Sequence, residues 1–508
     1  MVLAKPTEDG VEKKPQPRLK YINRQQQLLH PIDVERLVEA DHPVRAIWEL
    51  VGRMNLDGYY ESIEAVEGAA GREAFDPQLL ISVWIYAYSQ KVSSAREIAR
   101  RCHYDPAYQW LTGLEAVNYH TLSDFRVAHQ EALEALFIQV LGVLSQAGWV
   151  RLERVMQDGT KIKAQAGDHS FRRQGTLERH LEAARQRVRE MGEPGWEEVS
   201  QRRARARERA CREKQERVKL ALEQLAEIQA GKSSLSEKAE ARASMTDPEA
   251  RIMVQGKNGF APSYNVQLST DAQAGVIVGV GVSQAANDGA ELEPAVERLK
   301  ATWGKAPQQM VVDEGFITHS NVVSMDQQQI DLIGPVPDHS ASSEAGLKRR
   351  GVSPEFFPSA FVYDAAQDCY HCPAGKRLTY EGREKQGLTT RYRYRARASD
   401  CRDCPWKSGC CPTSRKGRSL VRSQDGLAMV AFKAKMATDE AQRIYKQRAG
   451  VAEFPNAWIK EKIGLRQFRL RGLAKVTREA LWVCLTYNIQ QWIRLVWRPH
   501  QQAALVVP

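Results

Sequence analysis

The sequence lacks an uninterrupted apolar run of about 18 residues, the length that a helix needs to cross a membrane, so no membrane span is expected. Its first residues, MVLAKPTEDGVEKKPQPRLK, also lack an apolar core, which argues against a secretory signal and predicts a polar tail over 1–26. Cysteine is scarce, at nine in 508 residues, which argues against a disulfide scaffold. Six of the nine lie between 369 and 411, which indicates a local metal site.

Charge is abundant but unbalanced in sign. Lys and Arg total 73 against 62 for Asp and Glu, a formal net charge of +11. This excess permits a polyanionic partner such as DNA, although net charge says nothing about fold. The charged share of 27% and the hydrophobic share of 43% are ordinary for a soluble globular protein, so the chain can build a sizeable core. Its length indicates roughly two to four domains.

Residues 27–148 are predicted to form an all-α domain that binds DNA. Segments 42–54, 76–90 and 129–148 have apolar residues at helical spacing. Asp76 followed by Pro77 suits a helix start, as cap and first-turn proline. HTLSDFR (120–126) offers a Ser or Asp cap for the next helix. The basic segment 94–111 could contact a DNA backbone, or it could be a solvated face of a structural bundle.

The hydrophobic period changes near residue 149, where segments of strand composition begin. The predicted strands are 149–158, 264–272, 276–284, 308–316 and 331–337. The second and third flank a short Gly-containing turn, as in a hairpin. An amphipathic helix is predicted at 291–304, between the hairpin and the fourth strand. This order indicates a mixed α/β sheet, divided between residues 149–171 and 244–345.

A charged insertion separates the two parts of the predicted sheet. Residues 172–243 are almost wholly Arg, Glu, Lys, Gln, Ala and Leu, with a break expected at 193–196. The composition predicts a long helical hairpin or coiled coil. We favour a solvated spacer slightly over an arm that contacts DNA or a second subunit.

A second insertion, residues 360–415, contains the clustered cysteines. Cys369-x-x-Cys372-Pro is followed by Cys401-x-x-Cys404-Pro and then by Cys410 and Cys411. Two C-x-x-C pairs at this separation are typical of a tetrahedral zinc site. The predicted ligands are four of Cys369, Cys372, Cys401, Cys404 and Cys410, because Cys410 could replace Cys369.

The stretch RYRYRARA (391–398) precedes the second cysteine pair. On a strand, its alternation would place three arginines on one face. That face could lie along a phosphate backbone. The alternative is an exposed edge strand that is protected by charge.

Asp158 and Asp313 occur in the same sequence context. Each is predicted to end an apolar strand and to precede a glycine-containing turn, in QDGT and VDEGF. An Asp-Gly turn is the plain alternative. Acids at the ends of adjacent strands can face one ligand, and a cation between them relieves their repulsion. Oxygen ligands without His or Cys favour Mg²⁺ or Mn²⁺. Lys161 and Lys163 would point the same way on an extended segment and could neutralise phosphates.

A third acid is available in the predicted C-terminal helices, residues 430–498. Tyr445, Arg448, Glu453 and Lys460 occur in order within the helix-forming stretch 438–464, where Pro455 is expected to interrupt the helix. Glu453 and Lys460 are seven apart, so they would share a helix face, whereas Glu461 lies off that face. A carboxylate there would complete a two-metal phosphoryl-transfer site. The closing segment 472–497 has an apolar stripe that we expect in the core.

Together these features resemble the DDE transposases of bacterial insertion sequences. The resemblance spans most of the chain and rests on the joint order of HTLSDFR, QDGTKIKA, TDPEARIM, YNVQLSTD, VVDEGF, the cysteine knuckle and the Tyr-Arg-Glu-Lys series. It implies an α/β fold: a ribonuclease-H-like mixed sheet with flanking helices, preceded by an all-α N-terminal domain. A charged helical-hairpin insertion and a small zinc-ribbon-like insertion complete the expected architecture.

The resemblance also implies roles for the candidate residues. Asp158, Asp313 and Glu453 would be the catalytic triad that binds two Mg²⁺ or Mn²⁺ ions, with a structural Zn²⁺ in the knuckle. The residues expected to contact DNA are Lys161, Lys163, Arg126, Tyr445, Arg448 and Lys460. Four residues separate Arg448 from Glu453, one more than in the commonest form of the signature.

The implied activity is that of a transposase. It would cut at the inverted-repeat ends of its element and transfer the 3′-hydroxyl ends to target DNA. The alternatives are a nuclease without strand transfer and an inactive DNA-binding regulator. The expected partners are double-stranded DNA and further copies of the chain, as a homodimer or larger assembly. The expected location is the bacterial cytoplasm, at the nucleoid when bound to DNA.

Overall fold

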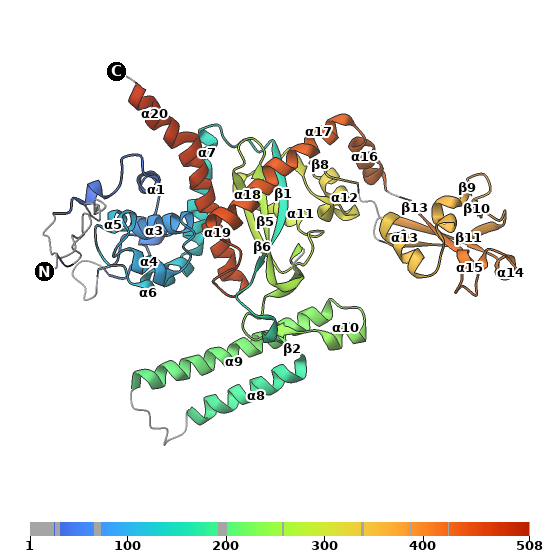
Figure 1. Ribbon diagram of the computed structural model, residues 1–508, viewed down its shortest axis with the longest axis horizontal. Coiled ribbons are helices and arrows are strands. Elements are labelled where there is room, and N and C mark those ends of the chain that lie inside the picture. The colour runs from blue at the N-terminus through green and yellow to red at the C-terminus, as the bar shows by residue number, and fades with distance from the viewer. Residues whose placement is uncertain are drawn as a thin grey trace, which may run out of the picture.

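The structure is a computed structural model that describes residues 25, 31–65, 73–191, 201–256, 259–336, 340–386, 389–424 and 426–506. Apart from Gln25, the predicted tail 1–26 lies outside these residues. Figure 1 shows a group of N-terminal helices, a central sheet, a projecting pair of helices and a separate strand-rich lobe. The boundaries predicted for the domains remain predictions.

The N-terminal region is helical throughout its described part. The helices are η1 (Val34–Leu37), α1 (Pro43–Gly52), α2 (Asp57–Tyr60), α3 (Pro77–Ser89), α4 (Ala95–Arg101), α5 (Pro106–Thr112), α6 (Tyr119–Val127) and α7 (Gln130–Gln146). Helix α3 lies in the core, where Trp84 and Tyr88 are fully buried. As expected, Asp76 caps α3 and Pro77 occupies its first turn.

The expected role of HTLSDFR as a cap was wrong. The motif lies inside α6, because the side chain of Asn118 accepts a hydrogen bond from the His120 N–H and so starts the helix earlier. Among the described residues, no single helix is long and apolar enough to cross a membrane. The bent pair formed by α6 and α7 passes that test by length and composition alone.

The centre of the molecule is a six-stranded mixed sheet. Its strands are β1 (Arg154–Lys163), β4 (Arg251–Val254), β5 (Phe260–Asp271), β6 (Ile277–Ser283), β7 (Gln309–Val311) and β8 (Asp331–Ile333). The order is β4-β5-β1-β7-β8, and β6 also pairs with β5. The pairs β5–β6 and β1–β5 are antiparallel, whereas β1–β7 and β7–β8 are parallel. This is the ribonuclease-H-like mixed sheet that the sequence predicts.

Strand β1 differs from the predicted strand in its bounds. It begins at Arg154 rather than Trp149 and continues through Asp158 to Lys163. The chain does not turn at Asp-Gly, because β1 pairs with β5 from Val155 opposite Asp271 to Lys163 opposite Ser263. Asp158 therefore lies in the middle of a strand, not at its end.

Helix α19 (Leu473–Trp492) joins the sheet to the N-terminal helices. Asn488 accepts from the Ile277 N–H and donates to the Ile277 carbonyl oxygen, which ties α19 to β6. On the other side, the Trp482 indole donates to the Arg126 carbonyl oxygen in α6. The prediction of a core stripe in 472–497 is confirmed, with Leu481, Trp482, Leu485, Ile489, Trp492 and Ile493 buried. The chain continues in η9 (Ile493–Trp497) and α20 (Arg498–Val506).

The charged insertion forms two long helices. These are α8 (Gln174–Met191) and α9 (Gln201–Ala230), followed by α10 (Leu235–Glu240), while the expected break at 193–196 lies outside the described residues. The insertion leaves the sheet through β2 (Phe171–Arg172) and returns through β3 (Ala243–Ser244), which pair with each other. A small core that includes Leu177 and Leu225 lies between the helices. Figure 1 shows the pair projecting away from the central sheet.

The strand-rich lobe contains the clustered cysteines. Its strands are β9 (Val362–Asp364), β10 (Cys369–His371), β11 (Arg377–Gln386), β12 (Thr389–Ala396) and β13 (Ser419–Gln424). Short helices α13 (Ser340–Arg349), η5 (Pro354–Phe356), η6 (Pro358–Ala360), α14 (Ala398–Arg402) and α15 (Lys407–Cys410) accompany them. The antiparallel order is β13-β12-β11-β10-β9. The alternative interpretation of RYRYRARA as an edge strand is therefore wrong, because β12 is paired on both sides.

The helices that follow the lobe return to the central sheet. They are α16 (Leu427–Met436), α17 (Asp439–Arg448), the π-helix η7 (Ala449–Glu453), α18 (Phe454–Trp458) and the π-helix η8 (Ile459–Ile463). The interruption expected at Pro455 was wrong, because the proline occupies the first turn of α18 and the wider π-helical turn precedes it. A π-helical turn holds one extra residue, which accounts for the long spacing from Arg448 to Glu453. Two further helices flank the sheet, α11 (Leu292–Trp303) and α12 (His319–Gln327).

Candidate active site

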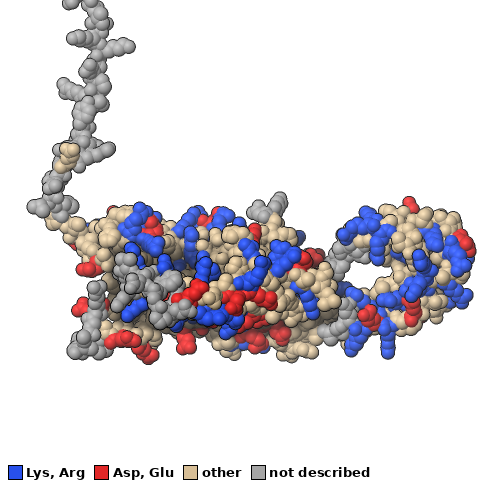
Figure 2. Space-filling view, turned by 90° about the horizontal axis from the view of Figure 1, so that it is seen from below, with Lys and Arg blue, Asp and Glu red and all other residues tan. Residues whose placement is uncertain are grey.

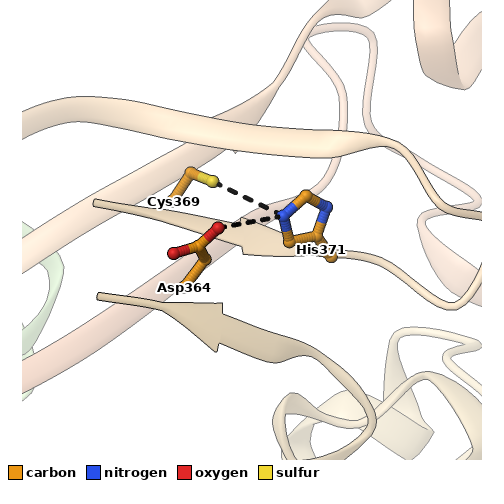
Figure 3. A group of neighbouring side chains, drawn as sticks. All are labelled: Asp364, Cys369 and His371. Carbon is orange, nitrogen blue, oxygen red and sulfur yellow. Dashed lines mark hydrogen bonds and ion pairs between the residues drawn. The ribbon is translucent and has the colours of Figure 1, made fainter. Parts of the chain in front are cut away.

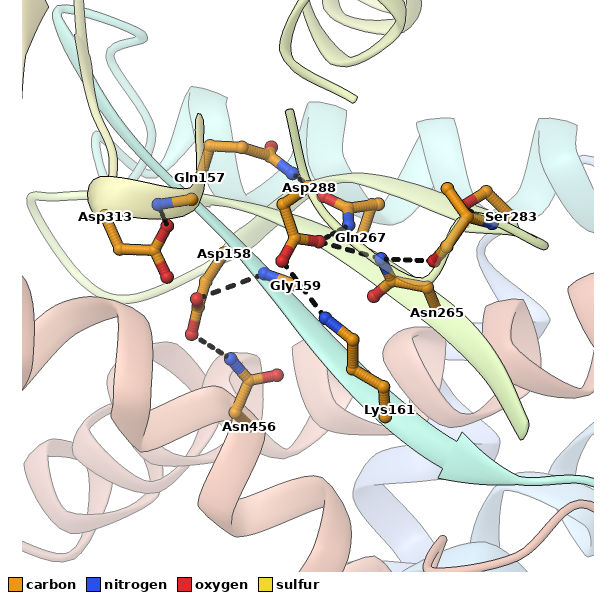
Figure 4. Close-up of polar contacts among 12 residues, drawn as sticks. Gln157, Asp158, Gly159, Lys161, Asn265, Gln267, Ser283, Asp288, Asp313 and Asn456 are labelled. Atoms are coloured by element: carbon orange, nitrogen blue, oxygen red, sulfur yellow. Dashed lines mark hydrogen bonds and ion pairs between the residues drawn. The ribbon is translucent and has the colours of Figure 1, made fainter. Parts of the chain in front are cut away.

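Two aspartates lie side by side on the parallel strands β1 and β7, and an arginine bridges them. Asp158 is on β1, and Asp313 caps the short helix η4 (Glu314–Phe316) just after β7. Arg448, at the end of α17, donates from Nη2 to Asp158 Oδ1 at 2.8 Å and lies 3.7 Å from Asp313 Oδ2. The structure thus brings together three residues that are far apart in the sequence, and Figure 4 shows two of them, Asp158 and Asp313.

Burial and mutual repulsion make both carboxyl groups hard to ionise. Burial raises the pKa of Asp158 to about 6, and Asp313 adds to the rise while the Arg448 guanidinium opposes it. The pKa of Asp313 is also raised by burial, with Arg448 opposing and Asp288 adding. Such a pair of carboxylates is stabilised in the ionised form when a cation lies between them.

Helix α18 supplies a polar contact that the sequence did not indicate. Asn456 donates from Nδ2 to Asp158 Oδ2 at 2.6 Å and to the Ala452 carbonyl oxygen at 3.2 Å. Its Oδ1 is buried and has no hydrogen-bond partner among the described residues. Lys460 lies close enough for Asp158 to favour its charged form, although burial lowers the pKa of Lys460. Figure 4 shows this unpaired oxygen on the far side of the amide from Asp158.

A third aspartate, Asp288, lies in the loop between β6 and α11. Its Oδ2 accepts from Lys161 Nζ at 3.1 Å, and its Oδ1 accepts from Asn265 Nδ2 at 2.7 Å and Gln267 Nε2 at 2.6 Å. Asp288 and Lys161 lie on the face of β1 opposite to Asp158 (Figure 4), because Asp158 and Lys161 are three residues apart on the strand. No local sequence signal marks it, because Asp288 lies five residues beyond the end of β6 at Ser283 rather than at a strand end.

The two glutamates considered for the triad lie elsewhere. Glu453 is exposed at the end of η7 and makes no hydrogen bond or ion pair with any described residue. Glu461 is also exposed and pairs with Arg466. The prediction that Glu453 and Lys460 share a helix face stays a prediction, and π-helical turns end at Glu453 and include Lys460. The role of Glu453 in the triad remains a prediction.

The residues predicted to contact DNA fall into different environments. Arg126 is a correction: it is buried, bonds the Ser93 carbonyl oxygen and stacks on Trp84, so its guanidinium cannot reach a DNA backbone. Lys163 is exposed at the end of β1, whereas Lys161 pairs with Asp288. Tyr445 is partly buried against the core. Only Lys161, Arg448 and Lys460 of this set lie beside the aspartates.

The cysteines of the lobe divide into two groups. Five thiols line one small cavity, from Cys372, Cys401, Cys404, Cys410 and Cys411. Cys369 lies instead beside His371 and Asp364 (Figure 3). Cys369 Sγ is 3.8 Å from His371 Nε2, and Asp364 Oδ2 is 3.7 Å from the same nitrogen. Cys369 and Cys410 were the two candidates for the fourth zinc ligand. Cys410 shares the cavity with the other thiols and Cys369 does not, which favours Cys410.

The five-thiol cavity gathers the candidate zinc ligands, but the described group whose ligand atoms lie within 4.8 Å of one another is Asp364, Cys369 and His371. The Lys376 and Arg418 N–H groups donate to the sulfurs of Cys372 and Cys401, at 3.3 and 3.4 Å. Burial raises the pKa of Cys410 to about 12, with neighbouring cysteines adding and Arg418 opposing. Zinc binding would offset this cost, because the metal deprotonates a coordinating thiol.

Two family models match the chain, in the regions whose geometry is described above. Residues 32–128, the N-terminal helices, match "Transposase domain (DUF772)". Residues 371–493, from β10 through α19, match "Transposase DDE domain". No curated protein matches the chain. These matches support an insertion-sequence DDE transposase, a family that implies divalent metal use and DNA binding.

Proposed function

We propose that this transposase cuts DNA at the inverted-repeat ends of an insertion sequence and transfers the exposed 3′-hydroxyls to target DNA. The observation that supports this most is the pair Asp158 and Asp313, held on adjacent parallel strands with Arg448 between them. Both reactions are in-line displacements at phosphorus, so one site can perform both. We place this activity in the bacterial cytoplasm, on dimers or larger assemblies that pair two ends.

The residues of the site divide the work. Asp158 and Asp313 present oxygen ligands, and Glu453 is retained as the family's third acid, which DNA or metal binding would have to bring inward. When bound, Mg²⁺ or Mn²⁺ would activate the attacking water or hydroxyl and stabilise the leaving oxygen. Lys460 and Lys163 would bind phosphates on either side of the acids. Arg448 would hold the two aspartates until metal replaces its charge.

The lobe has a supporting role in this proposal. Four of the five thiols in the cavity would hold a structural Zn²⁺, and Cys369 would not be among them. Figure 2 shows Lys and Arg side chains gathered over the visible face of this lobe, with few acids. We therefore propose that the lobe also lies along DNA, through the arginines of β12.

The test is Mg²⁺-dependent cleavage of linear DNA that bears the element's own ends. Wild type is compared with Asp158→Asn, Asp313→Asn and Glu453→Gln at equal DNA occupancy. Loss of roughly a thousandfold in cutting rate with each variant, without loss of binding, supports the triad. Asp326→Asn, an exposed acid on α12, is the matched control and should cut like wild type.

Other outcomes identify the alternatives. If Glu461→Gln stops cutting and Glu453→Gln does not, the third acid has been assigned to the wrong position. Cutting without joining of the ends to a target plasmid indicates a nuclease. DNA binding with no metal-dependent cutting by wild type contradicts the proposal and indicates an inactive DNA-binding regulator.

A further inference from the structure

Asp288 is built into the site from several directions. It comes from the loop between β6 and α11, yet it contacts β1 and β5 through Lys161, Asn265 and Gln267. The two amide residues are almost completely buried, at 0% and 1% exposure. Holding a carboxylate in one orientation with buried amides costs folding free energy, so we expect this orientation to serve a function.

Two glycines leave room for this arrangement. A Cβ on Gly159 would lie 2.2 Å from Asp288 Oδ1, so only glycine next to Asp158 allows Asp288 to approach β1. A Cβ on Gly315 would lie 3.2 Å from Asp313 Oδ1 and 3.8 Å from Asp288 Oδ2. Asp288 and Asp313 therefore lie near the same glycine, and Asp288 helps to raise the pKa of Asp313.

The two oxygens of Asp288 have different surroundings. Oδ1 accepts both buried amide groups, which fix the carboxylate. Oδ2 accepts only from the ammonium of Lys161, at the end of a long flexible side chain. One oxygen is thus tied to the protein, and the other faces a cation that can move away.

We propose that Asp288 is a metal ligand of the catalytic site through Oδ2, and that Lys161 takes the place of a divalent cation in the metal-free protein. Arg448 likewise lies between Asp158 and Asp313, whereas Lys161 pairs with Asp288 alone. Asn456 is nine-tenths buried, and its Oδ1 is unpaired among the described residues, on the amide whose Nδ2 bonds Asp158. The inference rests on the proposed function, because it adds a ligand to that same site.

The competing interpretation is that Asp288 only positions Lys161 for contact with DNA phosphate. The two interpretations predict opposite effects on metal binding. If Asp288 is a metal ligand, changing it removes a ligand and weakens metal binding. Changing Lys161 then removes a competing charge and strengthens metal binding. A positioning residue would leave metal binding unaltered and change DNA binding instead.

The experiment measures Mn²⁺ binding to the full-length protein without DNA, by the electron paramagnetic resonance signal of free Mn²⁺. Wild type is compared with Asp288→Asn, Lys161→Met and Asp326→Asn. We expect Asp288→Asn to weaken Mn²⁺ binding about tenfold or more. Lys161→Met should strengthen binding, and Asp326→Asn should leave it unchanged.

Mn²⁺ binding by Asp288→Asn equal to wild type overturns the inference. The thermal melting curve shows whether Asp288→Asn folds. If it does not, Lys161→Met is the deciding variant, and Mn²⁺ binding by Lys161→Met that is unchanged or weaker overturns the inference. Because no DNA is cut in this assay, its outcome is separate from that of the proposed function. Wild type could bind Mn²⁺ through Asp288 and still fail to cut the ends.

Discussion

The acidic site and the cysteine cavity differ in how their ligands are spread along the chain. The five thiols come from residues 372–411, within one small lobe. The acids come from β1, from the loop after β6 and from the end of β7, at residues 158, 288 and 313, and Asn456 adds a fourth element. A local site can be recognised from spacing in the sequence. A site assembled from distant strands depends on the register of the sheet.

The two sites also differ in what balances their charge without metal. The acids have Arg448 and Lys161 beside them. The thiols have backbone N–H groups and the partly buried Arg418, and the hydrophobic core of their lobe is small: Phe361, Leu378, Tyr394, Ala396 and Leu420. We infer that the central sheet folds without metal, whereas the lobe needs its metal to fold.

The largest expected effect follows from that difference. Removing zinc with a chelator, or changing Cys404→Ser, should unfold the lobe, with a loss on the order of 10 kcal/mol of binding free energy. Limited proteolysis with mass spectrometry should then find new cuts within 360–415. Removing Mg²⁺ should produce no such cuts anywhere in the central sheet.

Two cysteine variants sharpen this test. Cys211→Ser, on α9, should keep the zinc content and the protease pattern of wild type. Cys369→Ser should also keep the zinc, because Cys369 lies outside the five-thiol cavity. If Cys369→Ser loses the metal as Cys404→Ser does, the division of the thiols into two groups is wrong.

The next effect concerns the close packing of the acidic site. Gly159→Ala should destabilise the protein by about 1–3 kcal/mol, because the new methyl overlaps Asp288 Oδ1 and Gln267 Nε2. Denaturant unfolding measures this change. Gly142→Ala is the control: Gly142 is exposed on helix α7, an added Cβ would meet nothing within 4 Å, and the change should stabilise the protein by about 0.5–1 kcal/mol. If Gly159→Ala and Gly142→Ala change the free energy of unfolding equally, Asp288 does not need the space at Gly159.

Much of the fold follows from periodicity and composition. The hairpin of β5 and β6, the strands after residue 308 and the capped start of α3 were all predicted from their local sequence. The errors occurred where long-range pairing overrides a local signal. Asp158-Gly159 has the composition of a turn, but pairing with β5 keeps it extended. RYRYRARA has the composition of an edge strand, but β11 and β13 cover both of its edges.

The site was predictable only in part, for the same reason. Asp313 was found because it directly follows its strand. Asp288 lies several residues beyond β6, and nothing local shows that the loop folds back onto β1. The helices after Arg448 include two π-helical turns, which no apolar spacing predicts, and the contact of Asn456 with Asp158 was therefore not expected.

The pH dependence of Mn²⁺ binding tests the acidic site, and its expected effect is smaller than those above. Asp158 must be ionised to bind metal, and its pKa is raised to about 6. Mn²⁺ affinity should therefore be constant above about pH 6 and fall on the order of tenfold per unit below it, as one proton competes with the metal. In the metal-free protein the sign is reversed: the folded state retains the extra proton, so the free energy of unfolding falls as pH rises from about 4 to about 6. Mn²⁺ affinity that stays flat down to about pH 4 contradicts the shift.

The smallest effect tests whether the cysteine lobe contributes to DNA binding at all. Arg391 is exposed on β12 and makes no ion pair with any described residue, whereas Arg395 on the same strand bonds Glu381 at 2.7 Å. Arg391→Gln should weaken DNA binding by less than about 1 kcal/mol and reduce the slope of log affinity against log salt by about 1. Arg395→Gln is the matched control and should change the slope less, because Glu381 already compensates its charge. Equal slopes for both variants and wild type would restrict DNA contact to other parts of the chain, and the lobe would then differ from the acidic site in function as well as in construction.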